Sequence, residues 1–252
     1  MQNPTVSRDL LVLGEELEMY APSEHEADFQ YQEIFRHECY DRFTLRAEPA
    51  IVDVGANIGL FTVFAKRRWP QARILAFEPV PATAAYLRRN IALHGLRDVT
   101  VVREALGETD GTEITMVNYP NLPGNSTRYP QDKQLQIDAV ARRHPDWDLV
   151  EQYRAERVTV PLSRLSSHLS GLPHVDLLKV DAEGAELEIL RGIAPEHWPG
   201  IDNVVAEVQD LHSRLEATRA LLTERGFRCE VEPSPMVYPE IRTYLVTARR
   251  PV

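Results

Sequence analysis

The sequence predicts an α/β fold in which a seven-stranded, mostly parallel sheet carries helices on both faces. From residue 50 onward, short aliphatic runs alternate with amphipathic stretches, as in strands that are connected by helices. The runs RILAF, VTVV and VDLLKV are almost continuously apolar, which is typical of strands covered on both sides. A length of 252 residues suits one large domain of this class, or one domain with an appendage.

The elements follow one another along a main domain over residues 50–252. Strands are predicted near 50–54, 73–77, 99–103, 174–180, 202–206, 227–232 and 241–248. Helices are predicted near 59–68, 81–94, 184–191 and 211–225. The last helix presents Leu215 and Leu222 on one face, and Gly226 follows its end as a stop signal.

Two regions interrupt the alternation of strands and helices. Residues 1–49 contain a predicted helix over 28–40, and we expect them to form a helical cover before the first strand. Residues 112–160 contain the loop NYPNLPGNSTRYP and then a charged, helical piece divided by Pro145. Because a long excursion inside a compact domain is usually a lid or a binding loop, we expect an inserted lid here.

Composition and charge argue against several classes of partner. A net charge of −10 disfavours nucleic acid, because affinity for duplexes comes largely from neutralising phosphates. No apolar run approaches the roughly 18 residues of a membrane helix, and the start of the chain lacks the apolar core of a signal peptide. Cys39 and Cys229 lack metal-ligand spacing and are interpreted as free thiols. We therefore expect a cytoplasmic protein with no membrane partner.

The stretch IVDVGANIG joins the first predicted strand to the first helix, where open parallel sheets bind their ligands. Gly55 can adopt a positive φ or admit a ligand at contact distance, and Gly59 lets the helix approach closely. Asn57 lies between them. A phosphate would favour bare amides and positive charge, so Asp53 suits a cationic or amine-bearing ligand better. The alternative is a structural turn with a capping aspartate.

Acidic residues also follow the next two strands. In ILAFEP, Glu78 can accept hydrogen bonds from both ribose hydroxyls of an adenosine, and Pro79 turns the chain away. NAD and S-adenosylmethionine both contain this group, but the G-x-x-x-G spacing favours S-adenosylmethionine over a dinucleotide. In VVREAL, Glu104 and Ala105 are positioned to flank an adenine ring, although ordinary strand-end polarity explains them equally well.

The densest motif is VDLLKVDAEGAELEIL. Lys179 and Asp181 are two residues apart and share one face of a strand. A buried lysine is unfavourable unless it is paired, and Asp181 or Glu183 is the nearest partner. Glu186 and Glu188 fall in the first turns of the following helix, where interaction with the helix dipole explains them.

A further acidic residue, Glu207, ends the predicted strand NVVAEV. Asp53, Asp181 and Glu207 should therefore gather at one edge of the sheet. Carboxylates gathered in this way hold a cation, bind an amine or perturb one another's pKa values for proton transfer. His212 is a candidate general base, although a lone histidine at a helix start more often lies on the surface.

The stretches VDVGANIGLFT, AFEP and LLKVDAEGAELEIL resemble the FkbM-type methyltransferases over roughly residues 28–248. These enzymes use S-adenosylmethionine on a Rossmann-like seven-stranded sheet, the class I methyltransferase fold. FQYQEIFRHECY and LPGNST resemble the branch found with polyketide and nonribosomal peptide assembly lines. Members of that branch methylate hydroxyl oxygens of natural-product intermediates, sometimes while a carrier protein holds the substrate. The resemblance therefore implies an O-methyltransferase with a small-molecule or carrier-tethered acceptor.

The resemblance also implies roles for individual residues. Cofactor contacts are expected from Asp53, Gly55, Asn57, Gly59, Glu78, Pro79, Glu104, Ala105 and Asp181. Candidate catalytic residues are Asp181, Lys179, Glu207 and His212. Residues 24–40 and 118–130 are expected to cover the acceptor, with contacts from Tyr31, Glu33, Asn125 and Ser126. The chain departs from the branch at Gln209, where a histidine is common, so the general base stays open among His212, Asp181 and Lys179.

Several alternatives remain from the sequence alone. An NAD-dependent oxidoreductase conflicts with the glycine spacing, and a nucleic-acid methyltransferase conflicts with the acidic charge. A non-catalytic domain that binds cofactor or docks to an assembly-line protein is a third alternative, and an acceptor carbon or nitrogen a fourth. A metal-dependent variant would use Asp181 and Glu207, but no adjacent Asp-Asn pair follows, so no metal ligands are assigned.

Overall fold

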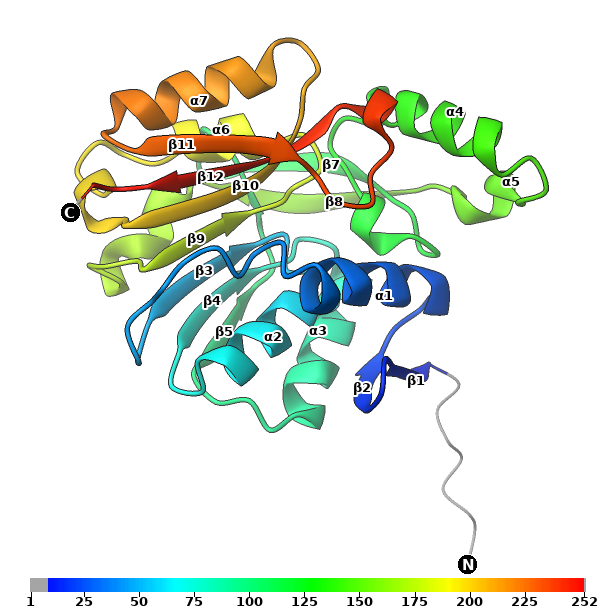
Figure 1. Cartoon of the computed structure of the whole chain (residues 1–252), viewed down its shortest axis with the longest axis horizontal. Coiled ribbons are helices and arrows are strands. Elements are labelled where there is room, and N and C mark those ends of the chain that lie inside the picture. Colours follow the sequence, from blue (N-terminus) through cyan, green and yellow to red (C-terminus); the bar gives the residue numbers. More distant parts are fainter. Residues whose placement is uncertain (1–8, 252) are drawn as a thin grey trace, which may run out of the picture.

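The computed structural model describes residues 9–251, and its centre is a seven-stranded sheet (Figure 1). The strand order is β11-β12-β10-β9-β3-β4-β5. The strands are β3 (Ala50–Val54), β4 (Arg73–Phe77), β5 (Val99–Val102), β9 (Leu177–Val180), β10 (Asn203–Gln209), β11 (Arg228–Pro233) and β12 (Thr243–Arg249). Each predicted strand is present, which confirms the predicted fold class.

Only β12 runs against its neighbours in this sheet. The connection from β11 to β12, residues 234–242, is too short for the crossover that parallel neighbours need, so the two strands pair as antiparallel partners. The other pairs, β10–β9, β3–β9, β3–β4 and β4–β5, are parallel. Their carboxyl ends therefore meet at one edge.

Helices cover both faces of the sheet, as predicted. Helices α2 (Leu60–Arg68) and α3 (Pro81–Leu93) lie on one face, and α6 (Glu186–Arg191) and α7 (Arg214–Glu224) lie on the other (Figure 1). Successive residues of β3 enter different cores, Ile51 on the α2 side and Val52 on the α6 side. This double burial explains the almost continuously apolar strands.

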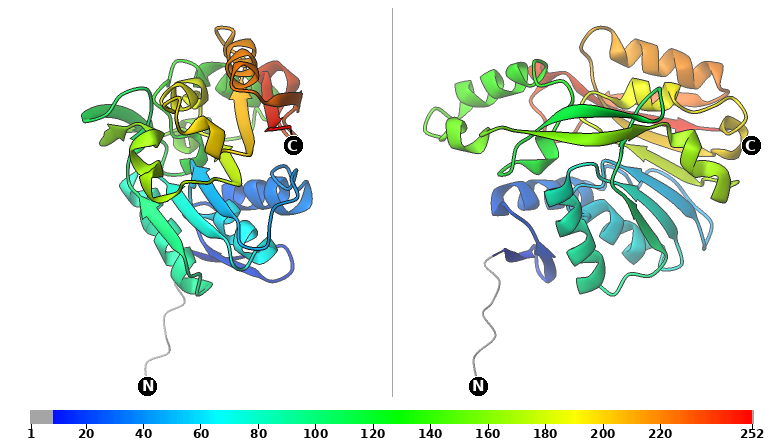
Figure 2. Two further views of the ribbon diagram at one scale, coloured as in Figure 1. Left: turned by 90° about the vertical axis from the view of Figure 1, so that its left-hand side faces the viewer. Right: turned by 180° about the vertical axis from the view of Figure 1, so that it is seen from behind.

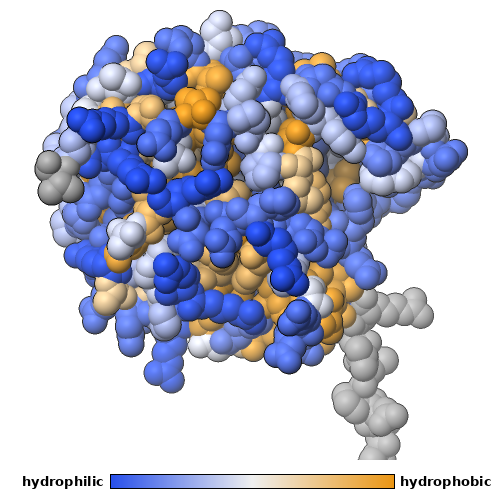
Figure 3. Space-filling view, viewed as in Figure 1, coloured by the Kyte–Doolittle hydropathy of each residue, from blue (hydrophilic) through white to orange (hydrophobic). Residues whose placement is uncertain are grey.

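On the face shown in Figure 3, hydrophilic residues predominate and hydrophobic patches lie between them. Within residues 9–251, no helix combines the length and apolar character needed to cross a membrane.

The N-terminal segment differs in part from the predicted helical cover. It begins with a hairpin of β1 (Leu10–Leu13) and β2 (Leu17–Tyr20), which the sequence analysis did not predict. Helix α1 (Glu24–Tyr31) then starts at its cap Ser23 and passes into a π-helical turn over Gln32–Arg36, so the helix ends before residue 40. Residues 1–8 of the predicted cover lie outside the described part of the chain.

The segment 112–160 is more ordered than the predicted lid loop. Strands β7 (Thr112–Asn118) and β8 (Glu156–Ser163) join β6 (Ala105–Leu106) in a second, three-stranded sheet. Helix α4 (Lys133–Arg143) ends two residues before Pro145, and α5 (Leu149–Gln152) follows. The view from behind shows α4 and α5 at the end of the molecule opposite the C-terminus (Figure 2).

Candidate active site

A cavity of about 220 Å³ opens at the carboxyl ends of β3, β4, β9 and β10. A water molecule needs only about 10–15 Å³ by this kind of measure, so the space suits an organic ligand. Most predicted site residues line it together. They are Glu33, Gly55, Asn57, Glu78, Pro79, Glu104, Ala105, Asn125, Ser126, Lys179, Asp181 and Glu207.

The loop after β3 is shaped by close approach to β9. Gly55 has a φ of 75°, and a Cβ atom there would lie 1.7 Å from the carbonyl oxygen of Asp181. The glycine is therefore required by the neighbouring backbone, which brings Asp181 against this loop. Asn57 also has a positive φ, 49°, and its side-chain Oδ1 is buried without a hydrogen-bond partner among the described residues.

Glu78, at the end of β4, is fixed by backbone donors. Its Oε2 accepts from the Asn57 N–H at 3.0 Å, and its Oε1 accepts from the Val80 N–H at 2.9 Å. Burial nevertheless raises the pKa of Glu78 to about 7. Each carboxylate oxygen has a second lone pair, so Glu78 keeps acceptor capacity toward the cavity.

Lys179 lies between the carboxylates of Asp53 and Asp181. Its Nζ lies 3.3 Å from Asp53 Oδ1 and 3.5 Å from Asp181 Oδ2, and it donates to the Gly55 carbonyl at 2.8 Å. Burial acts to lower the pKa of Lys179, but the carboxylates of Asp53 and Asp181 outweigh burial and raise it. The lysine is thus a permanent cation beneath the cavity, paired as the sequence analysis expected.

A second acidic group lies beside Lys179. The hydroxyl of Tyr40 is 3.1 Å from Asp181 Oδ2 and 3.3 Å from Glu207 Oε2, and Ser234 donates to Glu207 Oε1 at 2.9 Å. Burial, reinforced by Glu33 and Asp181, raises the pKa of Glu207 well above its ordinary value. Burial, with the charge of Asp181, also raises the pKa of Glu33 to about 8. These carboxyl groups hold protons where an exposed glutamate would be ionised.

Helix α1 and the turn at Pro123–Asn125 meet over the cavity. The Gly124 N–H donates to Glu26 Oε1 at 2.6 Å, and Asn57 Nδ2 lies 3.4 Å from the same oxygen. Burial raises the pKa of Glu26 to about 8, and its Oε2 has no hydrogen-bond partner among the described residues. One carboxyl group therefore joins α1, the inserted segment and the loop after β3.

The inserted segment also reaches the cavity through α4. Lys133 is 4% exposed, and its Nζ forms an ion pair with Glu183 and donates to Asn125 Oδ1 at 3.3 Å. The predicted residue Asn125 is held in place by this lysine. The cation that Glu183 contacts is consequently Lys133 and not Lys179, the partner that the sequence suggested.

Four predicted site residues do not line the cavity. Asp53 is fully buried beneath the cavity. Its carboxylate forms the ion pair with Lys179 and accepts a hydrogen bond from the Thr62 hydroxyl at 2.8 Å. Gly59 starts α2, and a Cβ there would lie 2.6 Å from Leu87 Cδ1 of α3. The remaining two are His212 and Tyr31.

His212 points away because the chain turns before α7. Both His212 and Ser213 have left-handed φ values, 54° and 60°, so the helix starts at Arg214 and not at the predicted residue 211. The His212 side chain is 75% exposed and lies 3.5 Å from Asp132. Tyr31 is stacked on Phe35 in the core. Neither side chain lines the cavity.

Sequence reasoning missed Tyr40, Glu26 and Lys133. Tyr40 lies in an irregular segment whose position depends on contacts with distant strands, so no local pattern indicates it. Glu26 precedes the predicted helix start, and Lys133 lies in a charged stretch that resembles a solvated surface. Of these three residues, only Glu26 has a signal in the sequence. Ser23 is a helix N-cap residue, and it places Glu26 in the first turn of α1.

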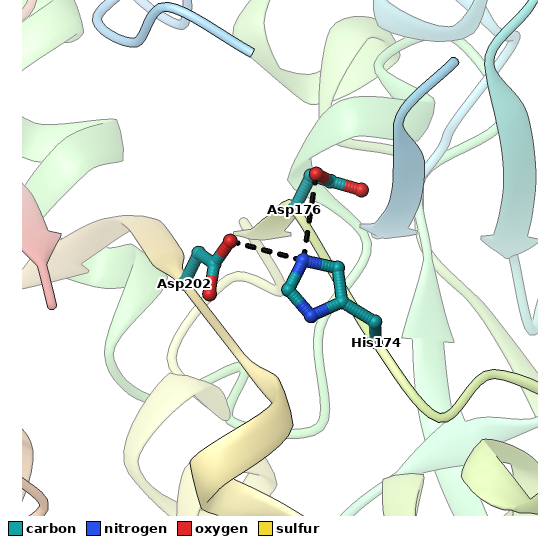
Figure 4. Close-up of side chains that lie close together, drawn as sticks. All are labelled: His174, Asp176 and Asp202. Atoms are coloured by element: carbon teal, nitrogen blue, oxygen red, sulfur yellow. Dashed lines mark ion pairs between the residues drawn. The ribbon is translucent and has the colours of Figure 1, made fainter. Parts of the chain in front are cut away.

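A separate cluster lies at the opposite end of the sheet. His174 Nε2 is 3.5 Å from Asp176 Oδ1 and 3.0 Å from Asp202 Oδ2 (Figure 4). Asp176 also accepts from the Ala50 N–H and from Arg46. The cluster precedes β9 and β10, and its side chains do not line the cavity. It ties the amino ends of these strands together.

Comparisons with known proteins agree with this geometry. The family model described as the methyltransferase FkbM domain matches residues 53–229. The chain is 41% identical over 228 residues to Methyltransferase 1 of Beauveria bassiana, covering 89% of this chain and 90% of that protein. It is 34% identical over 245 residues to the 31-O-demethyl-FK506 methyltransferase FkbM of Streptomyces tacrolimicus, covering 89% of this chain and 90% of that protein.

The fold also resembles a solved structure. The crystal structure of methyltransferase FkbM from Methylobacillus flagellatus KT matches with a TM-score of 0.53 and 14% sequence identity, over 82% of this chain and 45% of the other. At this identity the likeness concerns the fold alone.

Proposed function

Because the chain belongs to the FkbM methyltransferase family, we propose that it transfers a methyl group from S-adenosylmethionine to a hydroxyl oxygen of a natural-product intermediate. The observation that carries the proposal is the convergence of Glu78 and Asp181 on one cavity, at the carboxyl ends of β4 and β9. Parallel sheets bind nucleoside ligands at this edge.

The residues of the cavity fit S-adenosylmethionine. Glu78 offers acceptors for ribose hydroxyls, and the unpartnered Asn57 Oδ1 offers one more. Glu104 and Ala105 line the same cavity beyond β5 and would flank the adenine. A positively charged ligand favours the ionised form of nearby carboxyl groups, so the several buried acids that line the cavity suit such a ligand. Asp181 would lie beside that charge.

Chain residues then perform three tasks. Bound S-adenosylmethionine supplies a methyl group activated by positive sulfur. Lys179 and the Gly55 turn fix Asp181, which positions the acceptor hydroxyl and accepts its proton. Helix α1 and residues 118–130 exclude water, with Glu33, Asn125 and Ser126 facing the acceptor. Residues 9–49 and 112–160 therefore act as cover and lid of a catalytic domain that begins at residue 50.

The name of one relative supports the proposed acceptor class. The protein from Streptomyces tacrolimicus is named for O-methylation of a natural product, and it aligns along most of this chain. A hydroxyl-bearing small molecule, free or held by a carrier protein, is the acceptor class that we propose. The free thiols Cys39 and Cys229 fit the reducing cytoplasm that we propose as its location.

The proposal is tested in two steps. Calorimetry with S-adenosylhomocysteine should show binding, and Glu78→Gln should weaken it. Incubation of the protein with S-adenosylmethionine and hydroxyl-bearing polyketide or peptide intermediates should then yield a product heavier by one methylene, which Asp181→Asn should abolish. Binding without transfer to any acceptor would favour the non-catalytic alternative. A product methylated on carbon or nitrogen, located by NMR, would refute O-methylation.

A further inference from the structure

Tyr40 comes from outside the matched family domain and reaches the centre of the site. It lies between the π-helical turn and β3, whereas the family match begins at residue 53. The side chain is 1% exposed, and its ring packs edge-to-face on Phe61 of α2 with centroids 5.4 Å apart. This packing directs the hydroxyl toward the ends of β9 and β10, where it contacts Asp181 and Glu207.

The Tyr40 hydroxyl contacts two carboxyl groups, those of Asp181 and Glu207, but it can donate a hydrogen bond to only one of them. The hydroxyl carries one hydrogen, but it lies 3.1 Å from one carboxyl oxygen and 3.3 Å from another. If it donates to one carboxylate, the other carboxyl group must donate to the tyrosine oxygen or face it unpaired. A proton on one of Asp181 and Glu207 satisfies both contacts.

The surroundings decide which group carries it. Asp181 Oδ2 lies 3.5 Å from the Lys179 ammonium, which stabilises a negative charge. Glu207 has no cation within ion-pair distance among the described residues, and Glu33 and Asp181 add repulsion. Its Oε1 accepts from Ser234, which leaves Oε2 to hold the proton. The hydrogen-bond chain thus runs from Glu207 to Tyr40 and from Tyr40 to Asp181.

We infer that Tyr40 is a positioning residue that keeps Asp181 ionised as the general base by standing between Asp181 and a protonated Glu207. This inference rests on the proposed function for its chemical consequence. The acceptor oxygen forms a bond to the methyl carbon, the carbon–sulfur bond breaks with its electron pair moving to sulfur, and the acceptor proton passes to Asp181. The groups that face Tyr40 are Cys39, Glu33, Lys179 and the two carboxyl groups already named.

The test uses Tyr40→Phe, which keeps the ring and removes only the hydroxyl. A hydrogen bond to a charged acceptor corresponds to roughly one to two pH units, so the Asp181 titration should move upward by about one unit. Carboxyl-carbon NMR of protein labelled at Asp and Glu follows this titration without any acceptor, with Asp181→Asn identifying the signal. In the methyl-transfer assay, kcat/KM is measured as a function of pH. The acidic limb of this profile should move to higher pH by the same amount.

Two further variants separate positioning from general damage. Glu207→Gln keeps a donor toward the tyrosine oxygen, so it should move the limb less than Tyr40→Phe does. Tyr129→Phe removes a tyrosine–carboxylate contact outside the cavity, with Glu188, and should leave the limb in place. An unmoved Asp181 titration in Tyr40→Phe would overturn the inference. A moved titration in a protein that methylates no acceptor would uphold the inference about Tyr40 and refute the proposed function instead.

Discussion

Replacing Lys179 by methionine removes the cation between two carboxylates and keeps most of the volume of the side chain. Asp53 is fully buried, and its Oδ1 has no hydrogen-bond partner among the described residues apart from this ion pair. Removing one member of a buried pair leaves an uncompensated charge, and such changes destabilise proteins by about 3–5 kcal/mol. A loss of this size is a large part of the roughly 5–15 kcal/mol typical of a folded protein.

The double variant Lys179→Met/Asp53→Asn removes the uncompensated charge at the fully buried position 53 and should regain much of this loss; Asp181 still lacks its cation, but its side chain is 28% exposed. An asparagine can still accept from Thr62, so the remaining deficit comes from the unpaired carbonyl of Gly55, about 1–3 kcal/mol, and from the lost ion pair with Asp181. Lys66→Met is the matched control. Lys66 is also buried, but its Nζ donates to the carbonyls of Pro70 and Ala72, and no carboxylate lies within ion-pair distance among the described residues.

Urea unfolding followed by circular dichroism measures these differences. A double variant no more stable than Lys179→Met, or a Lys66→Met loss of equal size, would refute the assignment of Lys179 as the counter-ion of Asp53.

Three other changes test the parts of the site. Glu78→Gln leaves one oxygen acceptor for two backbone donors, so calorimetry should show S-adenosylhomocysteine binding at least about tenfold weaker. Glu26→Gln removes an acid whose pKa of about 8 lies above its ordinary 4.5, so the variant should gain stability over wild type as pH rises between these values, measured by urea unfolding. Gly55→Ala should cost about 2–5 kcal/mol in the same measurement, because its Cβ meets Asp181, whereas Gly95→Ala, also at positive φ but in open space, should cost only about 1–2.

The sheet could be predicted because strands that are buried on both faces are almost continuously apolar, and this pattern is visible in each short stretch of the sequence. A strand such as β3 is apolar at every position except Asp53, and a parallel sheet brings the ends of such strands to one edge. The convergence of Glu78, Asp181 and Glu207 followed from these two facts alone. The hairpin of β1 and β2 and the strand β7 were missed, because these strands are only partly buried and because β2 and β7 mix apolar with charged residues.

Side-chain partners within the site could not be predicted from strand ends. The position of Asp53 was foreseen, but its cation is Lys179 of the neighbouring strand, because the register of β3 and β9 places the two residues opposite each other. The left-handed turn at His212 removed the expected base from the cavity. Tyr40 entered from a segment with no periodic pattern. Each of these outcomes depends on contacts between residues far apart in sequence.

The burial of several acids in one cavity would destabilise the fold unless each had a donor, a cation or a proton. Glu78 has two backbone donors, Asp181 has Lys179, and Glu207 holds a proton toward Tyr40. Three buried oxygens of cavity-lining residues, Asn57 Oδ1, Glu26 Oε2 and Glu186 Oε2, nevertheless lack partners among the described residues. Native proteins leave few such atoms. The charged groups of the site thus have partners within the protein. The unpartnered oxygens remain available to a ligand with hydroxyl or amine donors, such as a cationic nucleoside.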